Sequence, residues 1–157
     1  MTVFVGKAGA FSAFGHEHEV SAPIASGTVD PDARRVEFTV RTASMKVLDP
    51  KTSDKDREET QKNMTGPEVL EVEKYPEIRF RSVTAERSGD SWTVKGELTI
   101  HGQTQPVSVS VKEQNGHYTG SAKIKQTDFG IKPIKAAGGT VKVKDELRID
   151  FDIQLAR

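Results

Sequence analysis

The chain has 157 residues, and its 23 lysines and arginines balance its 23 aspartates and glutamates, so the formal net charge is zero. This length is enough for one domain, spanning residues 1–157, to bury a hydrophobic core without the help of disulfides or a structural metal. The balanced charge argues against a nucleic-acid partner or a strongly anionic membrane surface, and the lack of cysteine excludes a thiolate zinc site and a cysteine nucleophile.

No run of apolar residues approaches the ~18 needed to cross a bilayer, so we expect no stable membrane insertion. Met1 to Gly6 lacks a basic segment followed by an apolar stretch and a small-residue cleavage site, and therefore contains no signal peptide. We expect the protein to be periplasmic or secreted if a signal peptide has been removed, and cytoplasmic otherwise.

The first third of the chain predicts strands. One is expected near Val3, another from about His16 to Val29, and a third where Val36, Phe38 and Val40 alternate with polar residues. A period of two is typical of strands with one buried face. The second and third are separated by a turn at Asp30-Pro31-Asp32.

The alternation stops between Asp49 and Tyr75, where the composition favours a short helical insertion around residues 53–72. Ser53 is a suitable N-cap with an acidic residue three positions later, and Gly66-Pro67 is expected to end the helix. Two interpretations stay open: a solvated surface helix that links two strands, or a lid or plug at one end of a barrel.

From Ile78 onward the alternation is almost continuous. Strands are expected around 78–81, 92–100, 107–111, 122–124 and 147–155, and the intervening turns include Ser88-Gly89-Asp90, His101-Gly102-Gln103 and Asn115-Gly116. Turns this short connect antiparallel neighbours. The total of roughly eight strands predicts an all-β fold, an eight-stranded antiparallel lipocalin-like barrel.

Bulky side chains recur on the predicted dry faces, at Phe38, Phe80, Trp92 and Phe151. In a barrel of this size they either meet and fill the centre or line a cavity. The sequence by itself does not choose between these arrangements, and a filled barrel would suit a protein-interaction domain.

His16 and His18 are two residues apart in a strand-like stretch, so both side chains should project from one face, together with Phe14 and Val20. This spacing suits metal ligation, and a metal-binding protein or metal-dependent enzyme is therefore an alternative function. Zinc usually takes at least three protein ligands, however, and the sequence identifies no third. Nor does it contain a nucleophile elbow, a phosphate loop or a dinucleotide fingerprint, so we expect no catalytic residues, cofactor or metal.

Four segments occur in the order typical of one protein family: Gly15-His16, residues 74–82 (KYPEIRFRS), residues 96–107 (GELTIHGQTQPV) and residues 128–131 (DFGI). Together they resemble the YceI-like family, whose members are lipid- or polyisoprenoid-binding proteins with a lipocalin-like barrel. The resemblance covers nearly the whole chain.

The resemblance implies a non-enzymatic bacterial binding or carrier protein, usually periplasmic, that transports a long apolar chain such as an isoprenoid, quinone tail or fatty-acid derivative. We expect it to act as a monomer or homodimer. The candidate ligand-binding residues are Phe14, Phe38, Phe80, Trp92, Leu98, Ile100, Phe129 and Phe151.

Overall fold

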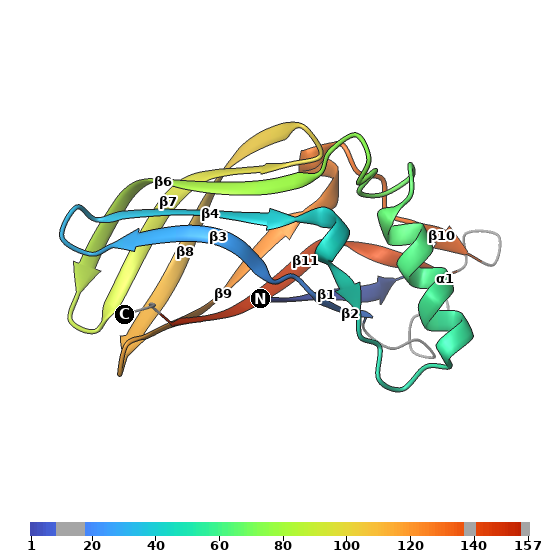
Figure 1. Ribbon diagram of the computed structural model, residues 1–157, viewed down its shortest axis with the longest axis horizontal. Coiled ribbons are helices and arrows are strands. Elements are labelled where there is room, and N and C mark those ends of the chain that lie inside the picture. The colour runs from blue at the N-terminus through green and yellow to red at the C-terminus, as the bar shows by residue number, and fades with distance from the viewer. Residues whose placement is uncertain (9–17, 137–140, 155–157) are drawn as a thin grey trace.

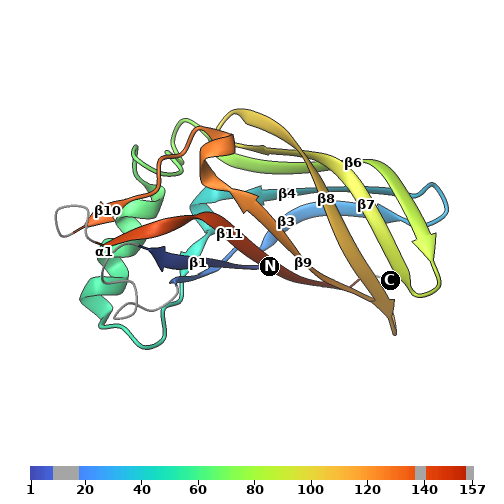
Figure 2. The same cartoon turned by 180° about the vertical axis from the view of Figure 1, so that it is seen from behind.

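The computed structural model describes residues 1–8, 18–136 and 141–154, which form one curled antiparallel sheet and a single α-helix (Figures 1 and 2). The strands follow the order β3-β4-β6-β7-β8-β9-β11-β1-β2-β5, and the short β10 pairs with β11. Their bounds are β1 Thr2–Ala8, β2 His18–Ser21, β3 Ile24–Asp30, β4 Arg35–Arg41, β5 Lys46–Val47, β6 Glu77–Ser88, β7 Ser91–Ile100, β8 Gln103–Gln114, β9 His117–Lys125, β10 Lys135–Ala136 and β11 Val141–Gln154. The expected all-β class is confirmed.

Two of the strands are bent. The single strand expected from His16 to Val29 is interrupted at Ala22-Pro23, because proline cannot donate to a ladder, and the described part continues as β2 and β3. In the same way the 3-10 helix η2 (Thr42–Ser44) separates β4 from β5. If each bent pair is counted as one strand and β10 is set aside, the described sheet has the eight long strands expected.

The bends determine how far the sheet curls. Val20 of β2 pairs with Val47 of β5 on one side and with Val3 of β1 on the other, which joins the two ends of the sheet near α1. β3, by contrast, has its only ladder partner among the described strands in β4, and it diverges from the C-terminal part of β11. The sheet is therefore a half-barrel that is joined at one end and splayed at the other (Figure 1).

Two tight turns fix the register of two long hairpins. His101-Gly102 joins β7 to β8, Asn115-Gly116 joins β8 to β9, and both residues of each turn have positive φ. Positive φ at both central positions is typical of a type I′ turn, whose twist matches that of antiparallel strands. The predicted hairpins are thus confirmed.

The helical insertion is confirmed as α1 (Asp54–Thr65), where the Ser53 hydroxyl accepts a hydrogen bond from the Asp56 amide and Gly66 is the C-cap. None of its residues is fully buried, so α1 is largely a solvated surface helix. The turns that follow it nevertheless bury Leu70 against the core, and Met64 and Val69 pack beside it. No described helix is long and apolar enough to span a membrane.

Candidate ligand-binding site

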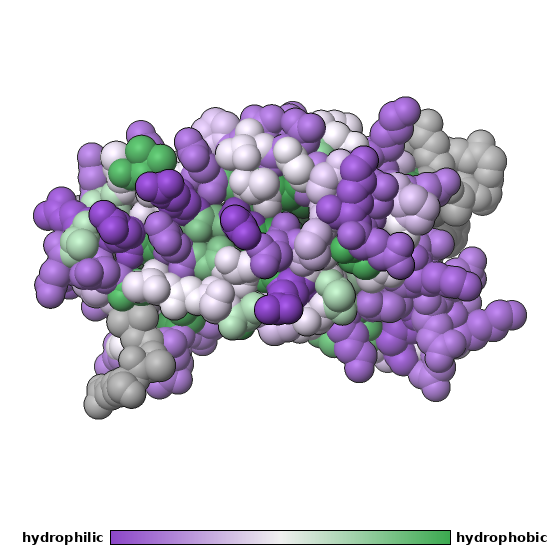
Figure 3. Space-filling view, turned by 45° about the horizontal axis from the view of Figure 1, so that its top comes forward, coloured by the Kyte–Doolittle hydropathy of each residue, from purple (hydrophilic) through white to green (hydrophobic). Residues whose placement is uncertain are grey.

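The inward face of the half-barrel surrounds a cavity of about 240 Å³. Its lining is almost entirely apolar and comes from β2, β3, β4, β6, β7, β8, β9 and β11. One end is lined by Met64, Val69 and Leu70 next to α1, and the opposite end by residues of the β3–β4 turn. The outer surface is different: Figure 3 shows mostly polar and charged side chains, with hydrophobic residues visible in the recesses between them.

The predicted ligand-binding residues meet at this cavity. Phe14 lies outside the described residues, and the other seven all line the cavity: Phe38, Phe80, Trp92, Leu98, Ile100, Phe129 and Phe151. The rings of Phe38 and Phe80 stack with their centroids 5.3 Å apart, while Phe129 is 2% exposed. Along β7 the buried residues alternate with exposed ones, which is the pattern used to predict them.

Two glycines let aromatic rings lie flat against the wall of the cavity. A Cβ atom on Gly96 would lie 2.6 Å from Cζ of Phe80, and one on Gly120 would lie 2.6 Å from Cζ of Phe151. Both distances are far below van der Waals contact. The missing side chains therefore leave room for the two rings on the sheet surface and keep them out of the lumen.

Trp92 lines the cavity and also contacts two charged residues, Glu113 and Arg87. Its ring lines the cavity, while its indole N–H donates to Glu113 Oε2 over 3.0 Å and the Arg87 guanidinium lies 5.5 Å from the ring centre. Burial, followed by the nearby charge of Glu113, raises the pKa of Tyr118, which also lines the cavity. The indole N–H of Trp92 and the hydroxyl of Tyr118 are thus both associated with Glu113, at the splayed end of the half-barrel.

The rim at the β3–β4 turn carries the charged residues of the lining. Asp30, Arg34 and Arg35 border the cavity and are exposed, and Arg34 has a left-handed backbone with φ of 54°. The zero net charge of the chain gave no indication that charged residues would border the cavity at this rim.

Sequence reasoning missed one polar residue inside the lumen. Gln126, in the 3-10 helix η3 (Gln126–Phe129), is 7% exposed and lines the cavity. The pattern did contain an indication of this position, because Gly120, Ala122, Ile124 and Gln126 follow one another at a spacing of two. A polar side chain that continues a dry face is a marker that the prediction did not use.

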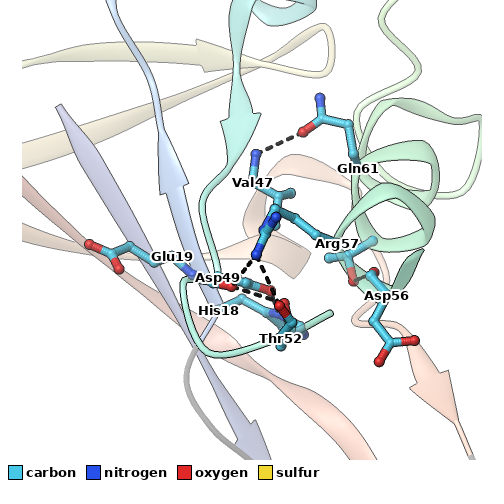
Figure 4. Close-up of polar contacts among 9 residues, drawn as sticks. His18, Glu19, Val47, Asp49, Thr52, Asp56, Arg57 and Gln61 are labelled. Carbon is cyan, nitrogen blue, oxygen red and sulfur yellow. Dashed lines mark hydrogen bonds and ion pairs between the residues drawn. The ribbon is translucent and has the colours of Figure 1, made fainter. Parts of the chain in front are cut away.

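Of the predicted histidine pair, His16 lies outside the described residues and His18 begins β2. The His18 ring nitrogen Nδ1 lies 2.6 Å from Asp49 Oδ2, and Asp49 Oδ1 accepts a hydrogen bond from the Glu19 amide (Figure 4). Asp49 is 1% exposed, so its carboxylate is held in a buried position by these partners. The described residues contain no group of three or more His, Asp or Glu placed to hold a metal ion.

The surroundings of Asp49 indicate a structural role for this contact. Arg57 of α1 donates to the carbonyl oxygens of Asp49 and Thr52, and Gln61 accepts a hydrogen bond from the amide of Val47 in β5 (Figure 4). Gln61 also donates to the carbonyl oxygen of Met45, just before β5. His18 and Asp49 therefore belong to a network that attaches α1 to β2 and β5.

Comparison with known proteins agrees with this architecture. The family model described as the YceI-like domain matches residues 2–155. A UPF0312 protein of Serratia proteamaculans is 32% identical over 112 residues, which are 65% of this chain and 54% of that protein. Protein YceI of Escherichia coli O157:H7 is 28% identical over 113 residues, 66% of this chain and 55% of that protein. The chain thus matches about half the length of these curated relatives.

Solved structures show the same fold. The crystal structure of Burkholderia cenocepacia BcnA superposes with a TM-score of 0.66 at 24% identity, covering 98% of this chain and 96% of that one. A YCEI protein of Campylobacter jejuni gives a TM-score of 0.60 at 16% identity, covering 87% and 80% of the respective chains.

Proposed function

The chain belongs to the YceI-like domain family, and on that premise we propose that it binds a long-chain apolar molecule, such as an isoprenoid, a quinone tail or a fatty-acid derivative, inside the half-barrel. The proposal depends chiefly on one observation: a cavity of about 240 Å³ whose lining is almost entirely apolar. The protein acts as a non-enzymatic carrier, as a monomer or homodimer. Its proposed place of action is the bacterial periplasm.

The chemistry of the lining favours hydrocarbon over other guests. Transfer of apolar surface out of water contributes ~0.8 kcal/mol for each buried CH₂ group, so a long chain gains affinity in proportion to the part of it that is enclosed. The lumen offers few polar groups to bind a sugar, nucleotide or peptide, whose polar atoms would lose water without replacement. A flexible chain also fits a narrow, elongated space better than a fused ring system.

The size of the cavity limits how much affinity a longer chain can gain. A cavity of about 240 Å³ encloses only a limited length of hydrocarbon. Affinity should therefore rise with chain length until the cavity is full and then level off.

Tryptophan fluorescence can report the binding of a guest in the cavity. Trp92 is the only tryptophan in the sequence, and its ring lines the cavity, so a guest that enters should change the indole fluorescence. The experiment titrates the protein with geraniol, farnesol and geranylgeraniol, which differ by one isoprene unit each, and measures heat by calorimetry alongside the fluorescence. We expect affinity to increase at each step. Equal affinities across the series, or heat without a fluorescence change, would contradict binding in the lumen.

The segment next to the cavity supplies a second test, of how the guest enters. Met64 at the end of α1 and Leu70 just beyond it line one end of the cavity, so movement of this segment would open it. A variant with residues 55–64 replaced by a Gly/Ser loop should bind and release geranylgeraniol faster, as followed by stopped-flow fluorescence. Unchanged rates in a variant that keeps its urea midpoint would show that α1 is not a gate.

A further inference from the structure

One side chain interrupts the apolar lining of the lumen. Gln126 follows the inward-facing residues of β9 and is 7% exposed, although an amide buried without partners is costly. The protein provides a partner for the NH₂ group of this amide, because Nε2 of Gln126 donates to the carbonyl oxygen of Lys144 on β11 over 2.9 Å.

The other half of the amide has no partner among the described residues. Lys144 presents a carbonyl oxygen, which only accepts hydrogen bonds, and so the NH₂ group must face β11 and the Oε1 atom must point elsewhere. No residue in the described part of the chain donates to this oxygen. The oxygen is also not enclosed by the protein. Among the described residues, the side-chain polar atoms that are buried without a partner are Arg57 Nε and His101 Nε2, and Gln126 Oε1 is not one of them.

The residue that follows Gln126 is also anchored to β11. The next residue, Thr127, donates its backbone amide to Asp145 Oδ1 and its hydroxyl to Asp145 Oδ2, over 2.8 and 2.6 Å. Adjacent residues of η3 thus bind adjacent residues of β11. The amide is held in one orientation before any guest arrives, which lowers the entropic cost of using it.

The other polar groups of the described lining are engaged or remote. The Trp92 N–H is used by Glu113, and Asp30, Arg34 and Arg35 lie at the rim of the β3–β4 turn, at the opposite end of the half-barrel from η3 (Figure 1). Gln126 Oε1 is therefore the acceptor available to a guest at the α1 end of the lumen.

We propose that Gln126 recognises a hydrogen-bond donor on the ligand, which makes the preferred guest a long-chain alcohol or primary amide whose polar group lies at the α1 end of the lumen. This inference rests on the proposed function. The hydroxyl or amide N–H of the ligand donates to Oε1, and the hydrocarbon chain extends toward the β3–β4 turn. Ethers and methyl esters lack the donor, and a carboxylate would face the amide oxygen with a negative charge, so both classes bind less well.

The test compares two isomers, of which only the first has a donor: hexadecanol and the methyl ether 1-methoxypentadecane. Because one neutral hydrogen bond contributes ~0.5–1.5 kcal/mol, wild-type protein should prefer the alcohol by roughly 2- to 12-fold. Gln126→Met keeps the length of the side chain and removes the acceptor, so the preference should disappear. In the control Ile131→Val, which trims another buried lining residue without changing its polarity, both ligands should weaken together and the preference should remain.

The ratio of the two affinities is measured within each variant, so a general loss of stability cancels. Should Gln126→Met fail to fold, the side-chain amide resonances of Gln126 in the wild-type protein serve instead, and they should shift with the alcohol and not with the ether. Equal affinities in the wild type, or a preference that survives Gln126→Met, would overturn this inference and leave the proposed function intact. If neither ligand binds, the proposed function itself fails.

Discussion

The effect of Trp92→Ala on stability distinguishes a hollow half-barrel from a filled one. In a tightly packed core, a Trp→Ala change removes the buried ring and leaves a new void, at a cost of up to ~5 kcal/mol. Here one face of the ring borders a cavity of about 240 Å³, so the new space merges with an existing one and fewer packing contacts are lost. We therefore expect a loss near the low end of the range, about 3 kcal/mol, including the hydrogen bond to Glu113.

The assay is equilibrium unfolding in urea, where a loss of ~3 kcal/mol at a slope of ~2 kcal/mol/M lowers the midpoint by about 1.5 M. Binding of a fluorescent polyene alcohol is measured on the same samples and should weaken, because the guest loses an apolar wall. Trp92→Phe is the control: it keeps most of the apolar surface, so it should retain binding. A loss near 5 kcal/mol with unchanged binding of the polyene would refute the argument and favour a filled barrel.

Three further predictions concern the wall, the acid stability and the metal content. Gly120→Ala places a Cβ 2.5 Å from the Ser110 carbonyl oxygen and 2.6 Å from Phe151 Cζ, so it should lower the free energy of unfolding in urea by about 1–3 kcal/mol. Because it pushes the Phe151 ring inward, it should also weaken the binding of geranylgeraniol more than that of geraniol. An unchanged dependence of affinity on chain length would contradict this. The hydrogen bond from the Thr127 hydroxyl lowers the pKa of Asp145, so its stabilising effect is complete above the ordinary value of 3.8 and is lost as pH falls through the lower folded-state pKa. Asp145→Asn should therefore destabilise by about 1 kcal/mol at pH 7 and by almost nothing near pH 2, and a difference independent of pH would disprove the assignment. Protein purified without added metal should contain no stoichiometric zinc in elemental analysis, since His18 is engaged by Asp49 and the described residues offer no set of three metal ligands. One equivalent of zinc that is lost in a His16→Ala, His18→Ala variant would reverse that conclusion.

Local chemistry made much of the fold predictable from the sequence. The alternation along β7 identifies a strand with one buried face, Asn115-Gly116 tolerates the positive φ of a type I′ turn, and Ser53 supplies the cap of α1. Each of these features depends on residues that are near neighbours in the chain. The same parity identified six described residues that line the cavity, because the dry face of a curled sheet can only point inward, whereas Phe129 was identified from the family resemblance.

Three-dimensional packing decided what the pattern left open. Whether Phe80 and Phe151 fill the barrel or lie on its wall depends on Gly96 and Gly120, which are distant from them in sequence and become neighbours only when the strands pair. The pairing of β2 with β5 likewise depends on long-range register, which periodicity does not encode. The free oxygen of Gln126 is a result of the same kind, since its availability follows from which atom of Lys144 faces the amide, and that is set by the packing of η3 on β11.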